Sequence, residues 1–176
     1  MLTESGLNVI YRVKQIIWAI ICSCKSIDYN YVDKFLNKQE QKIFRRLKKS
    51  EQHHSIRVSN EAIKLLNNNK YIELDKKEVI KASLLHDIGK IKYPMNLIEK
   101  VLLVILNKIT KGKIKKISSV LCIDIYYNHP KYSVEILKNL KSVYSNSFIE
   151  AINEHHNNDL ISNNLLNILR EADNKS

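Results

Sequence analysis

The stretch KASLLHDIGKIKYP, residues 81–94, places a histidine and an aspartate behind an apolar run and then ends that run with a glycine. Apolar residues before the pair recur three and four positions apart, which predicts a helix over residues 76–88. Gly89 offers the left-handed backbone with which helices commonly end. His86 and Asp87 therefore fall in the last turn of a helix, where they can share a centre only if other side chains arrive from other helices.

The same spacing runs through nearly the whole chain, so we expect an all-α fold. We predict helices over residues 7–24, 29–36, 39–48, 51–68, 76–88, 95–109, 114–127, 130–142, 147–157 and 160–173. Asp75 with Glu78, and Ser147 with Glu150, have the spacing of capping boxes. Pro130 loses no hydrogen bond in a first helical turn, so it predicts that a helix starts there.

Length and composition indicate one folded domain. The 176 residues are 44% apolar and include only three glycines and two prolines, which is a globular composition without a linker. The longest apolar stretch near the start, residues 16–22, is shorter than the roughly 20 residues that cross a membrane, and no signal-peptide cleavage site follows it. Three cysteines without a C-x-x-C pair indicate neither a disulfide framework nor a cysteine zinc site. We therefore expect a cytoplasmic protein without a membrane partner.

The net charge of +11 raises the question of a nucleic-acid partner, and two lysine-rich clusters, residues 42–49 and 111–116, give it local substance. Lysine far outnumbers arginine, which is the better residue for bidentate phosphate contacts. Phe44 is the only aromatic residue in the two clusters, which therefore lack the series of aromatic side chains that stacking platforms would provide. We favour a solvated basic surface, and nucleic-acid binding remains the alternative.

Histidines are the best indication of chemistry in this sequence. All six fall in four places: His53 and His54, His86, His129, and His155 with His156. Each alone is more often a structural or surface residue than a ligand, but together with the His-Asp pair they indicate a metal centre. Imidazoles with a few carboxylates favour Fe, Mn, Co, Ni or Zn over Mg, which prefers oxygen ligands. We therefore expect a divalent transition metal as cofactor.

Five motifs stand in a fixed order: HSIRV (54–58), LLHDIGK (84–90), NHPKYSVEIL (128–137), EHHNND (154–159) and ILREADNKS (168–176). On these residues the sequence resembles the HD-domain metal-dependent phosphohydrolases, and among them the HD-GYP-like branch. The resemblance implies a single-domain, all-helical HD-type fold with a central metal site that hydrolyses phosphate esters, often of nucleotides. It covers residues 50–176, and we interpret residues 1–49 as an N-terminal helical extension packed on the same domain.

The resemblance also assigns ligands, one residue at a time. It makes four residues the ligands of one metal ion: His54, His86, Asp87 and Asp173. It makes three more the ligands of a second ion, with Asp87 as the bridge: His129, His155 and His156. His53 falls outside the site, because the family pattern is H-x-x-R-V. One or two ions are therefore expected.

The catalytic candidates are Asp87, Lys90 and Arg57. Lys90 matches the lysine of the family's H-D-x-x-K pattern and could neutralise charge on a phosphate, as could Arg57 one turn after His54. Purely structural or surface roles are the alternative for several of the candidate site residues. His129 could be a helix N-cap, Lys90 a surface charge and Asp173 a solvated tail residue, and one of the adjacent histidines could lie on the surface.

One departure limits the substrate that the resemblance implies. HD-GYP enzymes that cleave cyclic di-GMP follow their His-His pair with a D-G-x-G-Y-P run, and the sequence after His156 has none. We therefore predict a metal-dependent phosphohydrolase that acts on a small phosphorylated molecule, a nucleotide, by metal-activated water. The alternatives are a regulatory module that binds metal or nucleotide without turnover and a basic nucleic-acid-binding protein.

Overall fold

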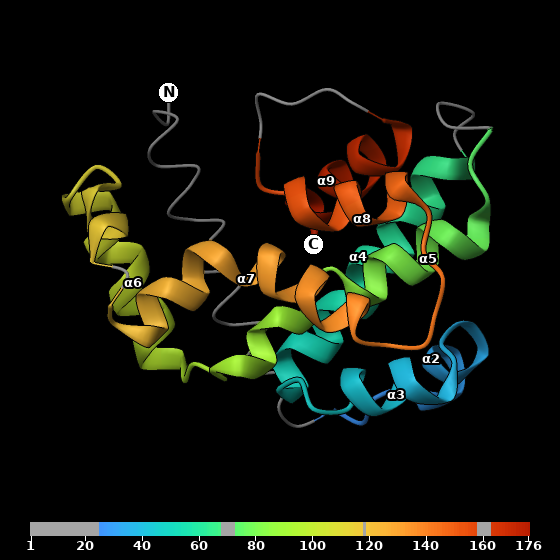
Figure 1. Ribbon diagram of the computed structural model, residues 1–176, viewed down its shortest axis with the longest axis horizontal. Coiled ribbons are helices and arrows are strands. Elements are labelled where there is room, and N and C mark those ends of the chain that lie inside the picture. Colours follow the sequence, from blue (N-terminus) through green and yellow to red (C-terminus); the bar gives the residue numbers. More distant parts are fainter. Residues whose placement is uncertain (1–24, 68–72, 118, 158–162) are drawn as a thin grey trace.

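The chain is helical over the residues that the structure, a computed structural model, describes: 25–67, 73–117, 119–157 and 163–176 (Figure 1). In chain order the helices are α2 (Tyr29–Phe35), α3 (Lys38–Phe44), α4 (Lys49–Asn67), α5 (Lys76–Leu85), the 3-10 helix η1 (Ile88–Lys92), α6 (Leu97–Ile109), the 3-10 helix η2 (Lys113–Lys116), α7 (Leu121–Lys138), α8 (Asn146–Glu154) and α9 (Asn164–Lys175). No strand occurs within these ranges, and the predicted all-α fold is confirmed. The helix predicted over residues 7–24 lies outside the described residues.

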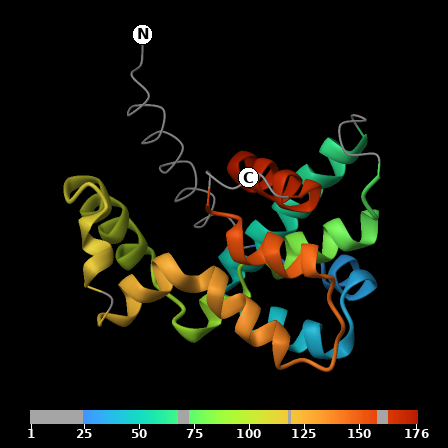
Figure 2. The same cartoon turned by 45° about the horizontal axis from the view of Figure 1, so that its top comes forward.

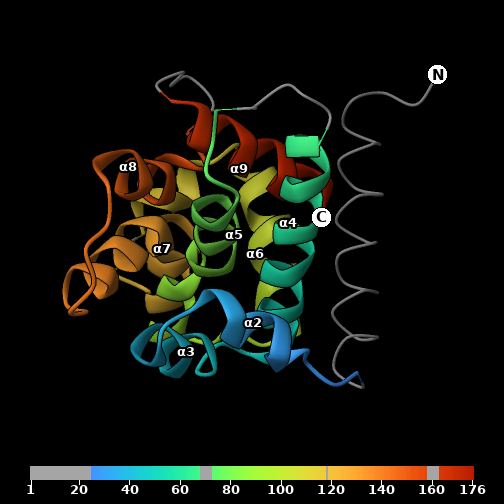
Figure 3. The same cartoon turned by 90° about the vertical axis from the view of Figure 1, so that its right-hand side faces the viewer.

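The main core lies between α4, α5, α8 and α9 (Figure 3). α4 packs against α5 and α9, and α8 packs against α7 and α9. Leu84, Phe148 and Leu166 are among the fully buried side chains of this core. α2 and α3 close one end of it with Val32 and Phe44, which are also fully buried. Helices from distant parts of the sequence are thereby held side by side.

A smaller core holds α6 and η2 against α7. It consists of Met95, Leu103, Ile114, Ile123 and Ile125. Figure 2 shows α6 and the first turns of α7 standing apart from α8 and α9. We call this part of the molecule the arm (residues 97–117 and 119–121). None of the described helices has both the length and the apolar character needed to cross a bilayer.

α7 continues through Pro130 without a break, so the two helices predicted on either side of this proline are one. A proline inside a helix cannot donate a hydrogen bond to the carbonyl four residues earlier, which here belongs to Tyr126. The Nδ1 atom of His129 donates to that carbonyl instead, at 3.2 Å. The histidine thus replaces the missing backbone hydrogen bond, and its alternative reading as an N-cap is wrong.

Gly89 has a role that differs from the predicted one. Among the described residues only Lys111 and Gly112 have a positive φ, so Gly89 is not a left-handed helix stop. A Cβ atom on Gly89 would lie 2.1 Å from the carbonyl oxygen of His129 and 2.7 Å from the backbone nitrogen of Ser133. Its own N–H donates to the Ser133 hydroxyl at 2.8 Å. Gly89 is therefore the point at which η1 approaches the backbone of α7.

The capping predictions are right at one position only. Asp75 caps α5 by accepting from a backbone N–H, but Glu78 does not complete a capping box and instead accepts from the Ser145 hydroxyl at 2.6 Å. α8 is capped by Ser145 rather than by Ser147, because the helix begins at Asn146. Glu78 thus forms a contact with the start of α8, although its spacing from Asp75 predicted a role at the start of α5.

Candidate metal centre

Asp87 lies between α5 and η1, is 1% exposed, and is surrounded by histidine rings from α4, from α7 and from the residues that end α5 and α8. Its Oδ1 atom is 3.0 Å from His129 Nε2 and 3.8 Å from His155 Nε2. Its Oδ2 atom is 3.3 Å from His86 Nε2 and 3.7 Å from His54 Nε2. The two oxygens of this carboxylate therefore face two different pairs of histidines, as the oxygens of a bridging ligand would.

A second carboxylate, Asp173, enters the cluster from α9. Its Oδ1 atom is 3.0 Å from His54 Nε2 and 3.8 Å from His86 Nε2, and its Oδ2 atom is 4.0 Å from His156 Nδ1. The apolar side of α9 docks in the main core, with Ile168 fully buried, and this carries the carboxylate inward. Asp173 is not a solvated tail residue, although it lies three residues from the C-terminal end.

The structure thus brings all of the predicted ligands into one cluster. Their ligand atoms form three overlapping groups in which every atom lies within 4.8 Å of the others. The groups are Asp87, His129, His155 and His156; His54, His86 and Asp87; and His86, His155 and Asp173. Two of the three contain Asp87, so this carboxylate belongs to both a group with His54 and a group with His129.

Backbone carbonyls fix the orientation of the buried rings. His86 Nδ1 donates to the Ser83 carbonyl at 2.8 Å, and His155 Nδ1 donates to the Ile152 carbonyl at 2.7 Å. His129 Nδ1 donates to two carbonyls of α7. A carbonyl can only accept, so Nδ1 carries the proton in all three rings and Nε2 is the atom turned toward Asp87.

Several of the atoms turned inward have no hydrogen-bond partner within the described residues. These are His86 Nε2, His155 Nε2 and Asp87 Oδ1, all buried. Leaving a buried polar atom unpaired costs about 1–3 kcal/mol, so native proteins rarely do so without a reason. A divalent transition ion is a group that imidazole nitrogens and carboxylate oxygens can satisfy together. The residues present therefore fit a metal.

The charge states favour the same conclusion. Burial opposes ionisation of Asp87, but His86 and Lys90 outweigh it and hold the pKa of this carboxyl well below 3.8. Burial, helped by the neighbouring His156 and His86, holds the pKa of His155 well below 6.5, so its ring is neutral at neutral pH. Burial would also lower the pKa of His86, but the Asp87 carboxylate outweighs it and raises that pKa to about 9. An ion that takes the place of this proton must bind more tightly as the pH rises.

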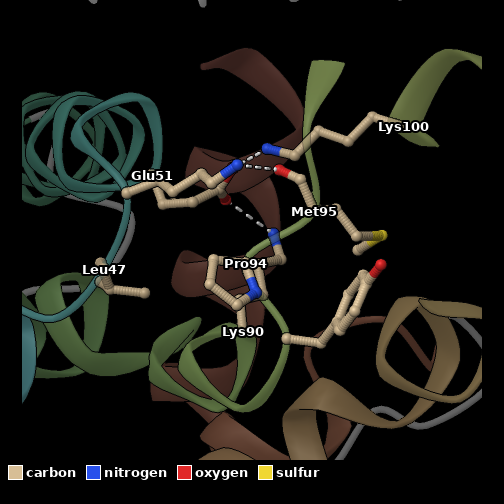
Figure 4. A pocket seen from close by; sticks show the side chains of 8 residues that line it. Leu47, Glu51, Lys90, Pro94, Met95 and Lys100 are labelled. Carbon is tan, nitrogen blue, oxygen red and sulfur yellow. Dashed lines mark hydrogen bonds and ion pairs between the residues drawn. The ribbon is translucent and has the colours of Figure 1, made fainter. Parts of the chain in front are cut away.

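Lys90 joins the cluster to a buried carboxylate that the sequence patterns did not single out. Its Nζ atom is 2.5 Å from Asp87 Oδ2 and 3.1 Å from Glu51 Oε2. Glu51, in the first turn of α4, also pairs with Lys100 of α6. Figure 4 shows Glu51, Lys90 and Lys100 around a small pocket beside the cluster. The Lys48 ammonium also lines this pocket and donates to the backbone carbonyl of Met95. Lys90 is thus an ordered, paired cation and not a surface charge.

Glu51 lies one turn before His54, which is the only local signal that could have pointed to it. Lys100 lies 49 residues further along the chain, and no spacing rule connects residues so far apart. Arg57 is partly buried, one turn after His54 on α4. His53 points elsewhere, with its Nε2 atom 3.3 Å from the carbonyl oxygen of Lys25.

The cluster is open to solvent on one side. The His86 and His155 side chains are fully buried, whereas His156 is 52% exposed and its Nε2 atom is 3.1 Å from His129 Nε2. His54 and Asp173 are partly exposed as well. A molecule that reaches the cluster would therefore approach past His54, His156 and Asp173.

Comparison with known proteins agrees with this geometry. The HD domain family matches residues 52–176, a range that starts inside α4 and includes every side chain of the cluster. No curated protein and no solved structure matches the chain. The match covers more than half of the sequence and contains the buried His-Asp pair. The chain therefore belongs to the HD domain family.

Proposed function

We propose that the protein is a metal-dependent phosphohydrolase that cleaves a phosphate ester or phosphodiester bond. The proposed substrate is a nucleotide. The observation that carries the proposal is the position of Asp87, whose two carboxylate oxygens face two pairs of inward-turned imidazoles. One or two ions of Fe, Mn, Co, Ni or Zn would be held there. Two ions are proposed because His129, His155 and His156 resemble the residues that bind a second ion in the HD-GYP-like branch.

A bound transition ion supplies water of lowered pKa as the nucleophile and polarises the phosphoryl oxygens. The protein's own residues supply the arrangement. Hydrogen bonds from Nδ1 to backbone carbonyls hold the rings of His86, His129 and His155 before any ligand arrives, so little ordering is left for binding. The ionised carboxylates of Asp87 and Asp173 balance positive charge in this buried place.

Lys90 has the position of a charge-neutralising residue. It is held against Asp87 by Glu51, so its ammonium group stands next to the cluster without having to be ordered by substrate. The phosphate would enter from the side bordered by His54, His156 and Asp173, which are the exposed members of the cluster. Arg57 remains a further candidate cation on α4.

A regulatory module that holds metal or nucleotide without turnover is the second candidate. The observation that favours it is the pairing of Lys90 with two carboxylates, since a phosphate would have to compete with both for this cation. The two candidates differ in one measurable property, because both predict bound metal and only the first predicts product.

The test starts with protein purified without chelator, whose metal content is measured directly. A panel of nucleotides and phosphodiesters is then assayed with Mn, Ni and Fe supplied. Asp87→Asn should lose both metal and hydrolysis, because the amide removes the charge and one oxygen ligand. Asp33→Asn, at an exposed aspartate that pairs with Arg45, is the matched control and should keep both. Metal without turnover on any substrate would favour the regulatory module, and unchanged metal in Asp87→Asn would overturn the site.

A further inference from the structure

The arm exposes an apolar face that the rest of the described chain does not cover. Most of the large apolar side chains exposed in the described residues lie between residues 98 and 121. Those on α6 are Ile98, Leu102, Ile105, Leu106 and Ile109, and the two end residues are 71% and 72% exposed. Their spacing places all five on one face of the helix. Contiguous exposed apolar surface of this kind marks a place of interaction.

The core of the arm does not need this face. Leu103, on another side of α6, is 4% exposed and packs in the small core against α7. Thr110, Lys111 and Gly112 then turn the chain, and η2 returns with Ile114 buried in the same core. After η2, three further apolar side chains are exposed: Ile117, Val120 and Leu121. The apolar face is therefore additional to what holds the arm together.

Positive charge predominates around this face, and Glu99 in the first turn of α6 is the one acidic residue of the arm. Residues 100–123 contain six lysines and neither aspartate nor glutamate. Five of these lysines are exposed: Lys108, Lys111, Lys113, Lys115 and Lys116. Lys115 lies 6.0 Å from the ring of Tyr127, and within the described residues no carboxylate pairs with any of the five.

The combination of an apolar face and unpaired lysines selects among partners. A second copy of the chain docked through this face would add its own lysines to the same interface, and like charges oppose this. A nucleic acid would satisfy the lysines but leave the isoleucines and leucines in water. An anionic bilayer satisfies both, because apolar side chains enter the boundary of the acyl chains while lysines meet the lipid phosphates.

We propose that the arm docks on the surface of an anionic phospholipid membrane, with the exposed apolar face of α6 turned toward the lipid. The helix would lie in the plane of the interface, as amphipathic surface helices do, and would not cross it. Such contact needs no spanning segment. The expectation of no membrane partner rested on the length of apolar stretches alone and did not consider a surface helix.

The test is a flotation assay of the full chain with two kinds of vesicle, phosphatidylcholine alone and phosphatidylcholine with about one-third phosphatidylglycerol. The protein should bind the anionic vesicles and leave them at high salt, because screening removes the lysine contribution. Leu102→Ser with Ile105→Ser removes part of the apolar face. Lys111→Gln, Lys113→Gln and Lys116→Gln together should weaken binding to anionic vesicles by about 100-fold, since each lysine near the surface contributes about fivefold.

Matched controls come from exposed residues of the body. Val143→Ser removes a fully exposed apolar side chain, and Lys138→Gln with Lys141→Gln removes exposed charge, so none of these changes should alter binding. Four results would overturn the proposal: no binding to anionic vesicles, equal binding to both vesicles, binding to RNA but not to vesicles, and a dimer that Leu102→Ser with Ile105→Ser dissociates. Vesicle binding that survives both sets of arm variants and is lost on deleting residues 1–24 would also overturn it.

Discussion

Gly89→Ala is the substitution whose effect the structure determines most sharply. The added methyl carbon would lie 2.1 Å from the carbonyl oxygen of His129 and 2.7 Å from the nitrogen of Ser133. Overpacking in a core costs about 1–3 kcal/mol. Both obstructing atoms belong to the backbone of α7 and cannot rotate away, so we expect a loss at the upper end, about 3 kcal/mol. In a domain of this size that is roughly 6–12 °C in the melting temperature.

The same substitution should weaken metal binding. η1 must move away from α7 to admit the methyl group, and Asp87 directly precedes η1 while His129 is part of α7. The distance from Asp87 Oδ1 to His129 Nε2, 3.0 Å, should therefore increase. We expect urea unfolding to report the lost stability and metal analysis to report fewer ions per chain.

Gly112→Ala is the matched control, because it is the same change at a glycine of the arm. Gly112 has a φ of +80°, and the nearest neighbour of an added Cβ would be a side-chain oxygen of Asn107 at 3.9 Å. The cost should be that of the backbone conformation alone, about 1 kcal/mol, with metal content unchanged. If Gly89→Ala were no less stable than Gly112→Ala and bound as much metal, the close approach of η1 to α7 would not exist as described.

Three further predictions concern the cluster and its surroundings. His156→Asn should lower the number of Mn ions bound in excess metal to one per chain while keeping the ion nearest His54, and a count of two in this variant would remove His156 from the ligand set. Deleting residues 172–176 should lower metal affinity and thermal stability together, whereas deleting residues 174–176 should leave most of both, because only the longer deletion removes Asp173. Equal metal content in the two truncated proteins would show that Asp173 is not a ligand. Glu51→Gln should destabilise the protein by about 1–2 kcal/mol at neutral pH, less than the full cost of breaking a buried pair because Lys90 and Lys100 are partly exposed. Burial opposes ionisation of Glu51, but these lysines outweigh it and hold its pKa below 4.5. The ion pairs therefore stabilise the fold above pH 4.5, and their contribution to stability is lost as the pH falls through the lowered pKa. Urea unfolding across acidic pH should show a narrowing difference in stability between wild type and Glu51→Gln, and a constant difference would contradict the pairing.

Helical class and the list of ligand types could be predicted because both depend on local patterns. Apolar residues three and four apart report burial along one helix, and this holds wherever the helix packs. The His-Asp pair and the ordered motifs identify the residue types of a metal site, and the structure brings every one of these side chains into a single cluster. The helix starts were less accurate, since Glu78 has a partner on another helix that competes with the helix end.

Contacts between helices determine the roles of several residues that the spacing of residues along the chain does not predict. Gly89 and Pro130 carry local preferences for a helix stop and a helix start, yet the first lies against the α7 backbone and the second lies inside α7, where His129 replaces its missing hydrogen bond. Glu51 and Lys100 meet only because α4 and α6 are neighbours in space. Local patterns were sufficient to predict a helical chain and the residue types of a candidate metal centre. That the two oxygens of Asp87 face different pairs of histidines follows only from the three-dimensional packing. The direction of a buried side chain is set by several helices at once and not by the residues beside it in the chain.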